Sequence, residues 1–564
     1  MGERRLTSAG RGEWGRTAAL MAPLAFLALF FFYPLGEILR LSLAPDGRLD
    51  LAPLAVLVQE PYYARVLWFT TWQAAVSTLL TLVLGLPAAY VFARYTFPGK
   101  TVLRALSTIP FVMPTVVVAA AFSALLGPNG EVNRWLMQIL HLSQPPLQMQ
   151  QTIWMILLAH VFYNATIVLR MVGGFWANLD PRLEQAAAVL GASRWRVFRE
   201  ITLPLLLPSL IAAALLIFLF CFTSFGVILI LGGPHFATLE VEIYRQAVNL
   251  FRLPVAAALA LVQMGLTLAI MAIYTRMQAR ATVALNFKPQ QATQRPITTW
   301  RGFAVVGLGI SLLFWLLLAP LAALVVRSLS TPDGLSLAYY QALFINQRQS
   351  ILFVPPLEAM RNSLLFALLA LALALILGVL SAYLLARPRA RASAWLDPLF
   401  MLPLGTSAVT LGLGFLVALD APPLNLRASP LLVPLAHTLV ALPFVIRSLL
   451  PVLRGLNPHL REAAAVQGAA PGRVWREVDL PILAPALIVG AVFAFTVSLG
   501  EFGATVLIAR PQMPTLPLAI YRFLGQPGAL NYGQALAASS LLMLVCAVGF
   551  ILLERVRYQE IGEF

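Results

Sequence analysis

Few residues in this chain have the types and spacing that covalent chemistry requires. Gly99, Lys100 and Thr101 match the end of a phosphate-binding loop, but that motif needs a glycine five residues before Gly99, where Arg94 stands. No strand is expected before this segment either. The sequence therefore predicts no catalytic residue, no ATP site and no bound cofactor in this chain.

The metal-binding and redox residue types are scattered. The two cysteines, Cys221 and Cys546, lie in separate apolar runs, which argues against a disulfide framework and against a C-x-x-C metal site. His160 and His437 each lie midway along an apolar run without fixed acidic companions nearby in the sequence. We expect them to form hydrogen bonds between helices rather than to bind a metal or relay protons.

A carboxylate inside an apolar run is the strongest polar signal of this kind. Glu501 stands in such a run, and the first half of the chain has Ser224 at the corresponding position. Charged groups at membrane depth are costly, so Glu501 is a candidate for the translocation pathway, with Ser224 as its partner position. A structural role in a bent helix is an equal alternative. Arg170 and Arg447 are expected to extend toward the membrane interface.

The composition indicates which elements must position these residues. Hydrophobic residues make up 60% of the 564 residues, charged residues only 11%, and the mean hydropathy is +0.83. A soluble domain has about 45–50% apolar and about 25% charged residues. The net charge of +16 would suggest nucleic-acid binding in a soluble chain. In a polytopic membrane protein it instead reflects basic loops, and no nucleic-acid partner is predicted.

Apolar runs long enough to cross a bilayer occur twelve times, since a span needs roughly 20 residues. Their expected ranges are 18–36, 66–93, 105–126, 153–172, 205–231 and 254–275 in the first half, and 302–326, 362–386, 396–419, 431–453, 482–509 and 534–553 in the second half.

The basic residues predict the orientation. With the N-terminus inside, 25 Arg and Lys residues fall in inner segments and 12 in outer segments. Because basic residues concentrate in cytoplasmic loops, both termini are expected on the cytoplasmic side of the cell membrane.

The two halves of the chain are copies of one another. Residues 158–160 and 435–437 both read Leu-Ala-His, and the same offset of 277 residues persists for nearly ninety residues. Each half has six spans and begins inside, so the repeat is parallel. The predicted organisation is a cytoplasmic tail (1–17), a first transmembrane domain (18–275), a cytoplasmic linker (276–301) and a second transmembrane domain (302–564).

The segment between the fourth and fifth spans carries one pattern in both halves. Asp180-Pro181 and Asn457-Pro458 are typical helix starts, and a glycine then allows a sharp helix end. The expected structure is a short surface helix, a bend and a return into the membrane at a proline. The patterned residues are Glu184, Gln185, Ala186, Ala187, Gly191 and Pro204 in the first half, and Glu462, Ala463, Ala464, Gly468 and Pro481 in the second.

This pattern, E-A-A-x-x-x-G followed after nine residues by I-x-L-P, resembles the "EAA" loop of binding-protein-dependent ABC importer permeases. Two copies in one chain resemble the fused permeases of the thiamine and ferric-iron importer group, and the resemblance covers about residues 60–564. One departure is Gln185, which stands where the second half has Glu462. The two loops are therefore expected to couple unequally.

The resemblance implies an all-α, twelve-span type I ABC importer fold, with both transmembrane domains in one chain. It also implies that the two loops dock two copies of a cytoplasmic ATPase, which carries ATP and Mg²⁺. Substrate would arrive on an extracytoplasmic binding protein. The acidic loop residue would pair with a basic group of the ATPase. The chain itself would be a permease embedded in the lipid bilayer, and not an enzyme.

The substrate is the least determined part of this interpretation. The segment from Phe222 to Tyr244 is more similar to thiamine permeases than to ferric-iron permeases, and Glu501 would suit a cation. Thiamine is therefore the first expectation and ferric iron the alternative. An alternative from a different class is an ion-coupled secondary transporter, which would require paired acidic residues within its spans. A third alternative, a membrane-embedded enzyme, would require clustered His, Asp and Glu residues.

Overall fold

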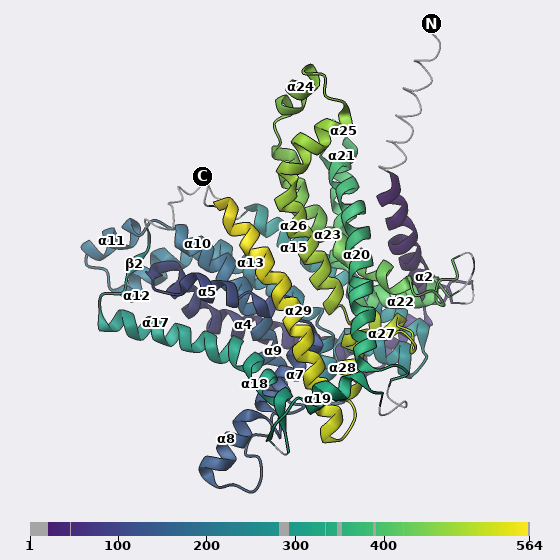
Figure 1. The fold of residues 1–564 in the computed structure, drawn as a ribbon, viewed down its shortest axis with the longest axis horizontal. Helices are drawn as coiled ribbons and strands as arrows, with labels where there is room; N and C mark the ends of the chain where they lie inside the picture. The colour runs from purple at the N-terminus through teal and green to yellow at the C-terminus, as the bar shows by residue number, and fades with distance from the viewer. Residues whose placement is uncertain are drawn as a thin grey trace.

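The computed structural model describes residues 21–561, except 46, 281–292, 333, 347–351, 387–390, 421 and 423. The predicted N-terminal tail and the middle of the predicted linker lie outside the described residues. The described part is almost entirely helical, as the composition predicted (Figure 1).

The first half contains the two-residue strands β1 and β2 and a series of helices, in which η marks π-helical or 3-10 turns. The elements are η1 (Ala28–Phe32), α2 (Tyr33–Leu43), α3 (Ala52–Gln59), α4 (Pro61–Arg94), β1 (Tyr95–Thr96), α5 (Lys100–Leu106), α6 (Ile109–Val112), α7 (Thr115–Leu126), α8 (Glu131–Leu140), α9 (Ile153–Ile167), η2 (Val168–Val172), α10 (Gly173–Asn178), α11 (Arg182–Val189), α12 (Arg194–Val197), η3 (Phe198–Thr202), α13 (Leu203–Phe222), η4 (Ile228–Gly232), α14 (Leu239–Tyr244), η5 (Arg245–Asn249), α15 (Leu253–Arg280) and β2 (Arg295–Pro296).

The second half repeats this series with a short hairpin after its first helix. The elements are α17 (Trp300–Leu313), η6 (Phe314–Leu318), α18 (Ala319–Leu329), β3 (Ser330–Thr331), β4 (Gly334–Leu335), α19 (Ala338–Gln341), η7 (Ala342–Phe344), α20 (Pro356–Leu385), α21 (Arg391–Gly405), α22 (Ala408–Ala418), α23 (Leu432–Gly455), α24 (Pro458–Val466), α25 (Pro471–Val474), η8 (Trp475–Asp479), α26 (Leu480–Gly500), α27 (Thr505–Ile508), α28 (Leu516–Leu524) and α29 (Ala529–Ile561). β1 pairs with β2 in parallel, and β3 with β4 antiparallel.

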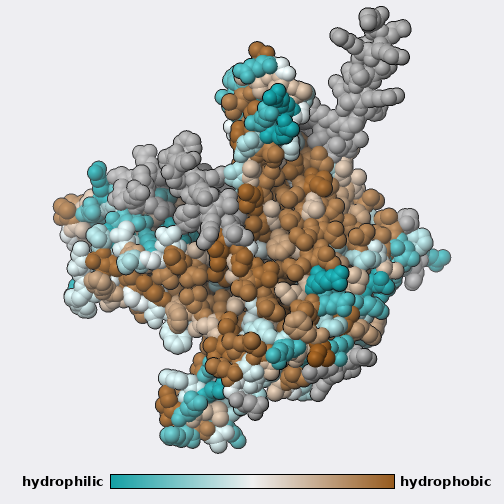
Figure 2. Space-filling view, in the orientation of Figure 1, coloured by the Kyte–Doolittle hydropathy of each residue, from teal (hydrophilic) through white to brown (hydrophobic). Residues whose placement is uncertain are grey.

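The helices confirm a multi-pass membrane protein. Within the described residues, eleven helices are long and apolar enough to span a membrane, and the bent pair α21–α22 brings the number to twelve. In Figure 2 hydrophobic residues cover a broad band over α20, α26 and α29, and hydrophilic residues gather at the end that carries α24.

The third span of each half is broken, whereas the sequence predicted continuous helices over 105–126 and 396–419. In the first half Pro110 and Pro114 divide the run into α5, α6 and α7. In the second half α21 and α22 meet at 97°. Ser407 begins α22 by accepting hydrogen bonds from the backbone N–H groups of Val409 and Thr410. Such breaks are tolerated at membrane depth because side chains and neighbouring helices satisfy the freed backbone groups.

The fifth span of each half also ends before its predicted limit. The ranges 205–231 and 482–509 were expected to be continuous, but α13 ends at Phe222 and α26 at Gly500. Short turns follow, η4 in the first half and α27 in the second. Both breaks fall next to the positions of Ser224 and Glu501, so these two residues lie outside regular helix.

The two halves exchange their first helices. In the first half α2 packs against both α15 and α22, and in the second half α18 packs against both α7 and α29. At the centre of this packing α7 is buried over Val116–Phe122. A helix that is apolar all round is expected to be buried on all sides. The exchange joins the halves into one body, whose two arms diverge toward α11 and α24 in Figure 1.

Candidate functional site

The first loop helix, α11, begins and ends as its sequence predicted. The carboxylate of Asp180 accepts a hydrogen bond from the backbone N–H of Arg182 at 3.0 Å, which caps the first turn. At the other end Gly191 has φ +84°, a left-handed conformation that glycine adopts without steric cost. Two backbone bonds close this end, from Ala192 to the carbonyl of Ala187 and from Gly191 to that of Ala188. This is the Schellman arrangement of a helix C-terminus.

The second loop helix, α24, reproduces this geometry almost bond for bond. The Asn457 side chain accepts from the N–H of His459 at 3.0 Å. Gly468 has φ +83°, and Ala469 donates to the carbonyl of Ala464 at 3.1 Å. The repeated sequence therefore produces a repeated rigid element with a defined direction at each end.

Both loop helices present apolar side chains to the surroundings. Val189 is 88% exposed and its counterpart Val466 is 89% exposed, and Leu183 and Leu460 are exposed in the same way. Figure 1 places α11 and α24 at the ends of the two diverging arms. Paired apolar surface on otherwise polar loops is typical of a docking site.

The remaining patterned residues lie within these two helices or at the start of the spans that follow them. Gln185, Ala186, Glu462 and Ala463 are exposed, and Ala187 and Ala464 are half-buried. Pro204 and Pro481 are the second residues of α13 and α26, directly after the π-helical turns η3 and η8. A proline clashes with the carbonyl of the preceding turn. A π-helical turn before it relieves this clash, so the helix continues into the membrane.

The acidic group of the first loop points inward rather than outward. Glu184 Oε1 lies 2.7 Å from Nη2 of Arg94 on α4, whose side chain is 6% exposed, and accepts from the Thr202 hydroxyl at 3.0 Å. The second half reverses the charges: Arg461 stands at the position of Glu184, and its Nε lies 2.7 Å from Oδ1 of Asp479. Asp479 occupies the position of Thr202. Neither pair was predicted, although the 277-residue offset aligns Glu184 with Arg461 and Thr202 with Asp479.

The expected acidic partner group is therefore present in only one loop. Glu462 is 68% exposed, and its carboxylate contacts only the His459 ring, at 3.0 Å, among the described residues. Gln185 is exposed at the matching position. The expected inequality of the two loops remains a prediction, but Glu184 is already engaged by Arg94 and Thr202.

The two buried histidines both form hydrogen bonds between helices, but with different partners, and Nε2 of His437 also lies 3.4 Å from the Glu501 carboxylate, an acidic neighbour that was not expected. His160 contacts the hydroxyls of Ser77 and Ser224, both at 2.9 Å. His437 contacts Ser498 and Thr505, both at 2.8 Å. Within the part of the chain that the structure describes, no group of three or more His, Cys, Asp or Glu residues could hold a metal ion.

Glu501 closes the break after α26. One carboxylate oxygen accepts from the backbone N–H of Ala504 at 2.8 Å. The other accepts from the N–H and the hydroxyl of Thr505, at 3.0 and 2.6 Å. Glu501 therefore caps the short turn α27. It also lines, together with Ser224, a cavity of about 400 Å³ between the two halves; we call it the Glu501 cavity.

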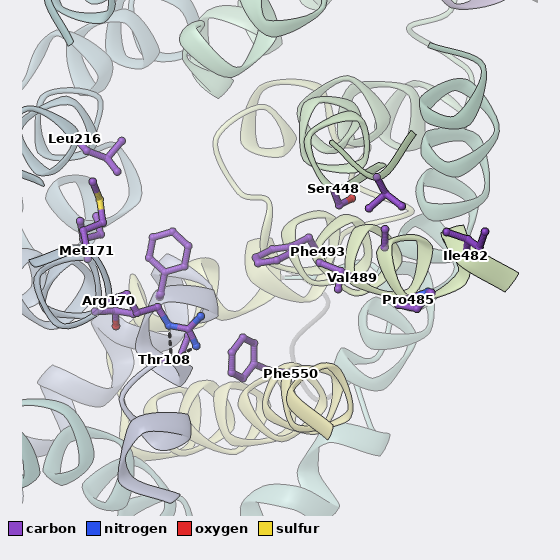
Figure 3. Close-up of a pocket in the computed structure, with 15 residues that line it drawn as sticks. Thr108, Arg170, Met171, Leu216, Ser448, Ile482, Pro485, Val489, Phe493 and Phe550 are labelled. Carbon is purple, nitrogen blue, oxygen red and sulfur yellow. Dashed lines mark hydrogen bonds between the residues drawn. The ribbon is translucent and has the colours of Figure 1, made fainter. Parts of the chain in front are cut away.

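A second cavity of about 610 Å³ adjoins it and shares Phe111 and Phe493 with it. Figure 3 shows Arg170 and Met171 from the first half facing Phe493 and Val489 from the second. Arg170 donates to the Thr108 hydroxyl at 2.7 and 3.1 Å. Arg170 is exposed and lines this cavity, and the expectation that it extends toward the membrane interface remains a prediction.

The segment that resembles a phosphate-binding loop is used structurally. A two-residue strand, β1, does precede it, contrary to expectation, but Lys100 donates to the carbonyl of Tyr95 at 2.6 Å. Burial, reinforced by the nearby charge of Arg104, lowers the pKa of Lys100 to about 8. Lys100 thus holds the turn into α5.

Comparison with known proteins identifies the family. A family model described as "Binding-protein-dependent transport system inner membrane component" matches residues 81–283 and again residues 374–557. The chain belongs to this family. Two matches in one chain make it a fused, two-domain ABC importer permease. This membership removes the secondary-transporter and membrane-enzyme alternatives.

Relatives of this permease include both full-length and half-length proteins. The thiamine transport system permease protein ThiP of Salmonella typhimurium is 27% identical over 542 residues, covering 95% of this chain and 96% of that protein. The probable ABC transporter permease protein y4fN of Sinorhizobium fredii is also 27% identical, covering 93% and 92%. The sulfate transport system permease protein CysT of Escherichia coli is 30% identical over 47% of this chain and 93% of its own length.

Proposed function

We propose that this permease imports thiamine. The observation that carries the proposal is the similarity to thiamine permeases over nearly the whole length of both chains. The sulfate permease relative covers only half of this chain, so it supports the fold of one domain rather than a substrate.

We further propose that α11 and α24 dock two copies of a cytoplasmic ATPase, which binds the ATP and Mg²⁺. Three features support this: the matched apolar faces, the rigid glycine-terminated helix ends, and the position of both helices at the ends of the diverging arms. A short helix held at both ends can transmit closure of a partner as rigid-body movement of the spans. An extracytoplasmic binding protein would deliver the substrate at the opposite face, with both termini of the permease cytoplasmic.

Uptake in a strain lacking this gene tests the substrate. We expect radiolabelled thiamine to accumulate only when the permease gene is restored. A hundredfold excess of unlabelled thiamine should abolish the signal, and excess sulfate or ferric citrate should leave it unchanged. Restored uptake of ferric iron or sulfate, without thiamine uptake, would contradict the proposal. The Gly468→Pro variant, with its level in the membrane measured, serves as the inactive control.

A further inference from the structure

The Glu501 cavity is lined by many aromatic side chains. Six phenylalanine rings border it in three close pairs. One pair lies within the first half, one within the second half, and one joins the two halves. Phe111 and Phe220 lie 6.2 Å apart between ring centroids, Phe444 and Phe493 lie 6.0 Å apart, and Phe225 and Phe502 lie 5.7 Å apart.

The cross-half pair marks the axis of the repeat. Phe225 and Phe502 are matched residues at the 277-residue offset, and their rings stack with an interplanar angle of 23°. Each ring also contacts a matched tyrosine, Tyr244 or Tyr521. Of this aromatic group Phe225 and Phe502 line the cavity, while Phe111 and Phe493 line both this cavity and the larger neighbouring one.

The aromatic lining of this cavity favours a positive occupant. Among the described residues that line it, none is Lys or Arg, and Glu501 is the one carboxylate. That carboxylate is held by Ala504, Thr505 and, at 3.4 Å, by His437, and Arg170 lines the neighbouring cavity, so the phenylalanine rings supply the attraction for a cation. The face of a phenylalanine ring carries the negative end of its quadrupole, so a cation placed over such rings is attracted. A volume of about 400 Å³ is within the range of small-molecule sites.

We propose that the Glu501 cavity is a binding site for a flat or quaternary organic cation, held between the Phe444–Phe493 and Phe111–Phe220 ring pairs. The inference rests on the proposed function, since thiamine carries a quaternary thiazolium ring. It adds that the permease itself recognises the positive charge, within the membrane, after the substrate leaves its carrier.

The repeat shows which rings are specific to this site. At the position of Phe493 the first half has Leu216, and at the position of Phe444 it has Ile167. Both counterparts are apolar, so a helix packed at these positions does not require an aromatic ring. The aromatic rings of Phe444 and Phe493 are therefore features of this cavity that the repeated fold does not require.

The same comparison supplies the variants. Phe493→Leu and Phe444→Ile install the residues that the first half already uses, and they remove the ring faces with little change in hydrophobicity. Phe495→Leu is the matched control, because Phe495 lies on the same helix and lines neither cavity. Progressive fluorination of the Phe493 ring keeps its shape and weakens its quadrupole, which separates charge recognition from packing.

Binding is measured on the full-length chain in lipid nanodiscs, with radiolabelled thiamine and with benzyltrimethylammonium as a simpler cation. One cation–π contact is worth roughly 1 kcal/mol, or about fivefold in affinity. We expect Phe493→Leu and Phe444→Ile each to weaken binding of both cations about fivefold, with a stepwise loss on fluorination and no change for Phe495→Leu. Unfolding temperatures monitor folding of each variant.

Two results would overturn the site: no saturable binding of either cation, or affinity that fluorination of Phe493 leaves unchanged. These outcomes differ from failure of the proposed function. Cells that take up no thiamine, with Phe493-dependent binding of benzyltrimethylammonium, would refute thiamine import and support the site. Thiamine uptake that is indifferent to the Phe493 and Phe444 variants would support the function and refute the site.

Discussion

The reversed charge pairs beneath the loop helices lead to a prediction that separates anchoring from docking. In the first half Glu184 is paired with the buried Arg94, and in the second half Glu462 extends into the surroundings. Glu184→Gln should therefore destabilise the permease itself, whereas Glu462→Gln should leave its stability unchanged and weaken ATPase binding.

The structure gives the size of the effect. Removing one partner of a buried ion pair costs about 3–5 kcal/mol, because the other charge remains buried without compensation. Glu184 is 32% exposed, so water compensates part of the loss, and we expect about 1–3 kcal/mol. An exposed substitution such as Glu462→Gln should change folding stability by less than about 0.5 kcal/mol.

The reversed arrangement also provides a rescue variant. Glu184→Arg alone places a second positive charge beside Arg94 and should be the most destabilising change. Adding Thr202→Asp recreates the second half's pairing of Arg461 with Asp479 and should restore much of the stability.

The assay compares unfolding temperatures with co-purification of the ATPase for each variant. The reasoning is refuted if Glu184→Gln keeps the wild-type unfolding temperature and loses the ATPase. That result would mean that the Glu184 carboxylate faces the partner and not Arg94. It is equally refuted if the double variant is no more stable than Glu184→Arg.

Three further predictions concern other parts of the molecule. At Gly468 a Cβ would meet nothing within 4 Å, so only the left-handed backbone opposes substitution. Asn should lower the folding stability least, Ala by about 1 kcal/mol and Val by more. A loss of ATPase binding in the Ala variant that exceeds its loss of stability would show that a partner covers this glycine. Replacing His437 with Ala removes the imidazole partner of the Ser498 hydroxyl, whereas the Thr505 hydroxyl still donates to Glu501, and should destabilise the protein by about 1–3 kcal/mol. EDTA should leave the unfolding temperature of the wild type unchanged, and destabilisation by EDTA would refute a purely hydrogen-bonding role. A cysteine introduced at position 290 should resist labelling from outside intact cells, and efficient labelling would refute the predicted orientation.

Local sequence was sufficient for the parts of the fold that one segment determines alone. Gly191 and Gly468 predicted the ends of α11 and α24, because only a left-handed residue closes a helix in that way. The repeat offset likewise predicted that His160 and His437 would be equivalent, and both form hydrogen bonds between helices. Twelve spans followed from apolar length, which depends on the bilayer and not on tertiary contacts.

Features that depend on distant segments were not predictable in this way. The break at Ser407 lies inside an apolar run whose sequence predicts one continuous helix. Only the structure shows the hydrogen bonds by which Ser407 starts a new helix there. The exchange of α2 and α18 between the halves leaves no periodic signal, since a helix in a membrane is apolar whichever neighbour it meets. Arg94 and Asp479 form ion pairs with Glu184 and Arg461, which lie 90 and 18 residues away along the chain.

Site-specific photocrosslinking tests the central claim, that α11 and α24 both dock an ATPase, most directly. A crosslinking residue at Val189 and, separately, at Val466 places the probe at matched exposed positions, with Trp135 on the distant helix α8 as the control. The account predicts that both positions crosslink to the same ATPase subunit, identified by mass spectrometry, and that Trp135 does not. Absence of any ATPase adduct at both loop positions, in membranes where the permease is folded and active, would contradict it.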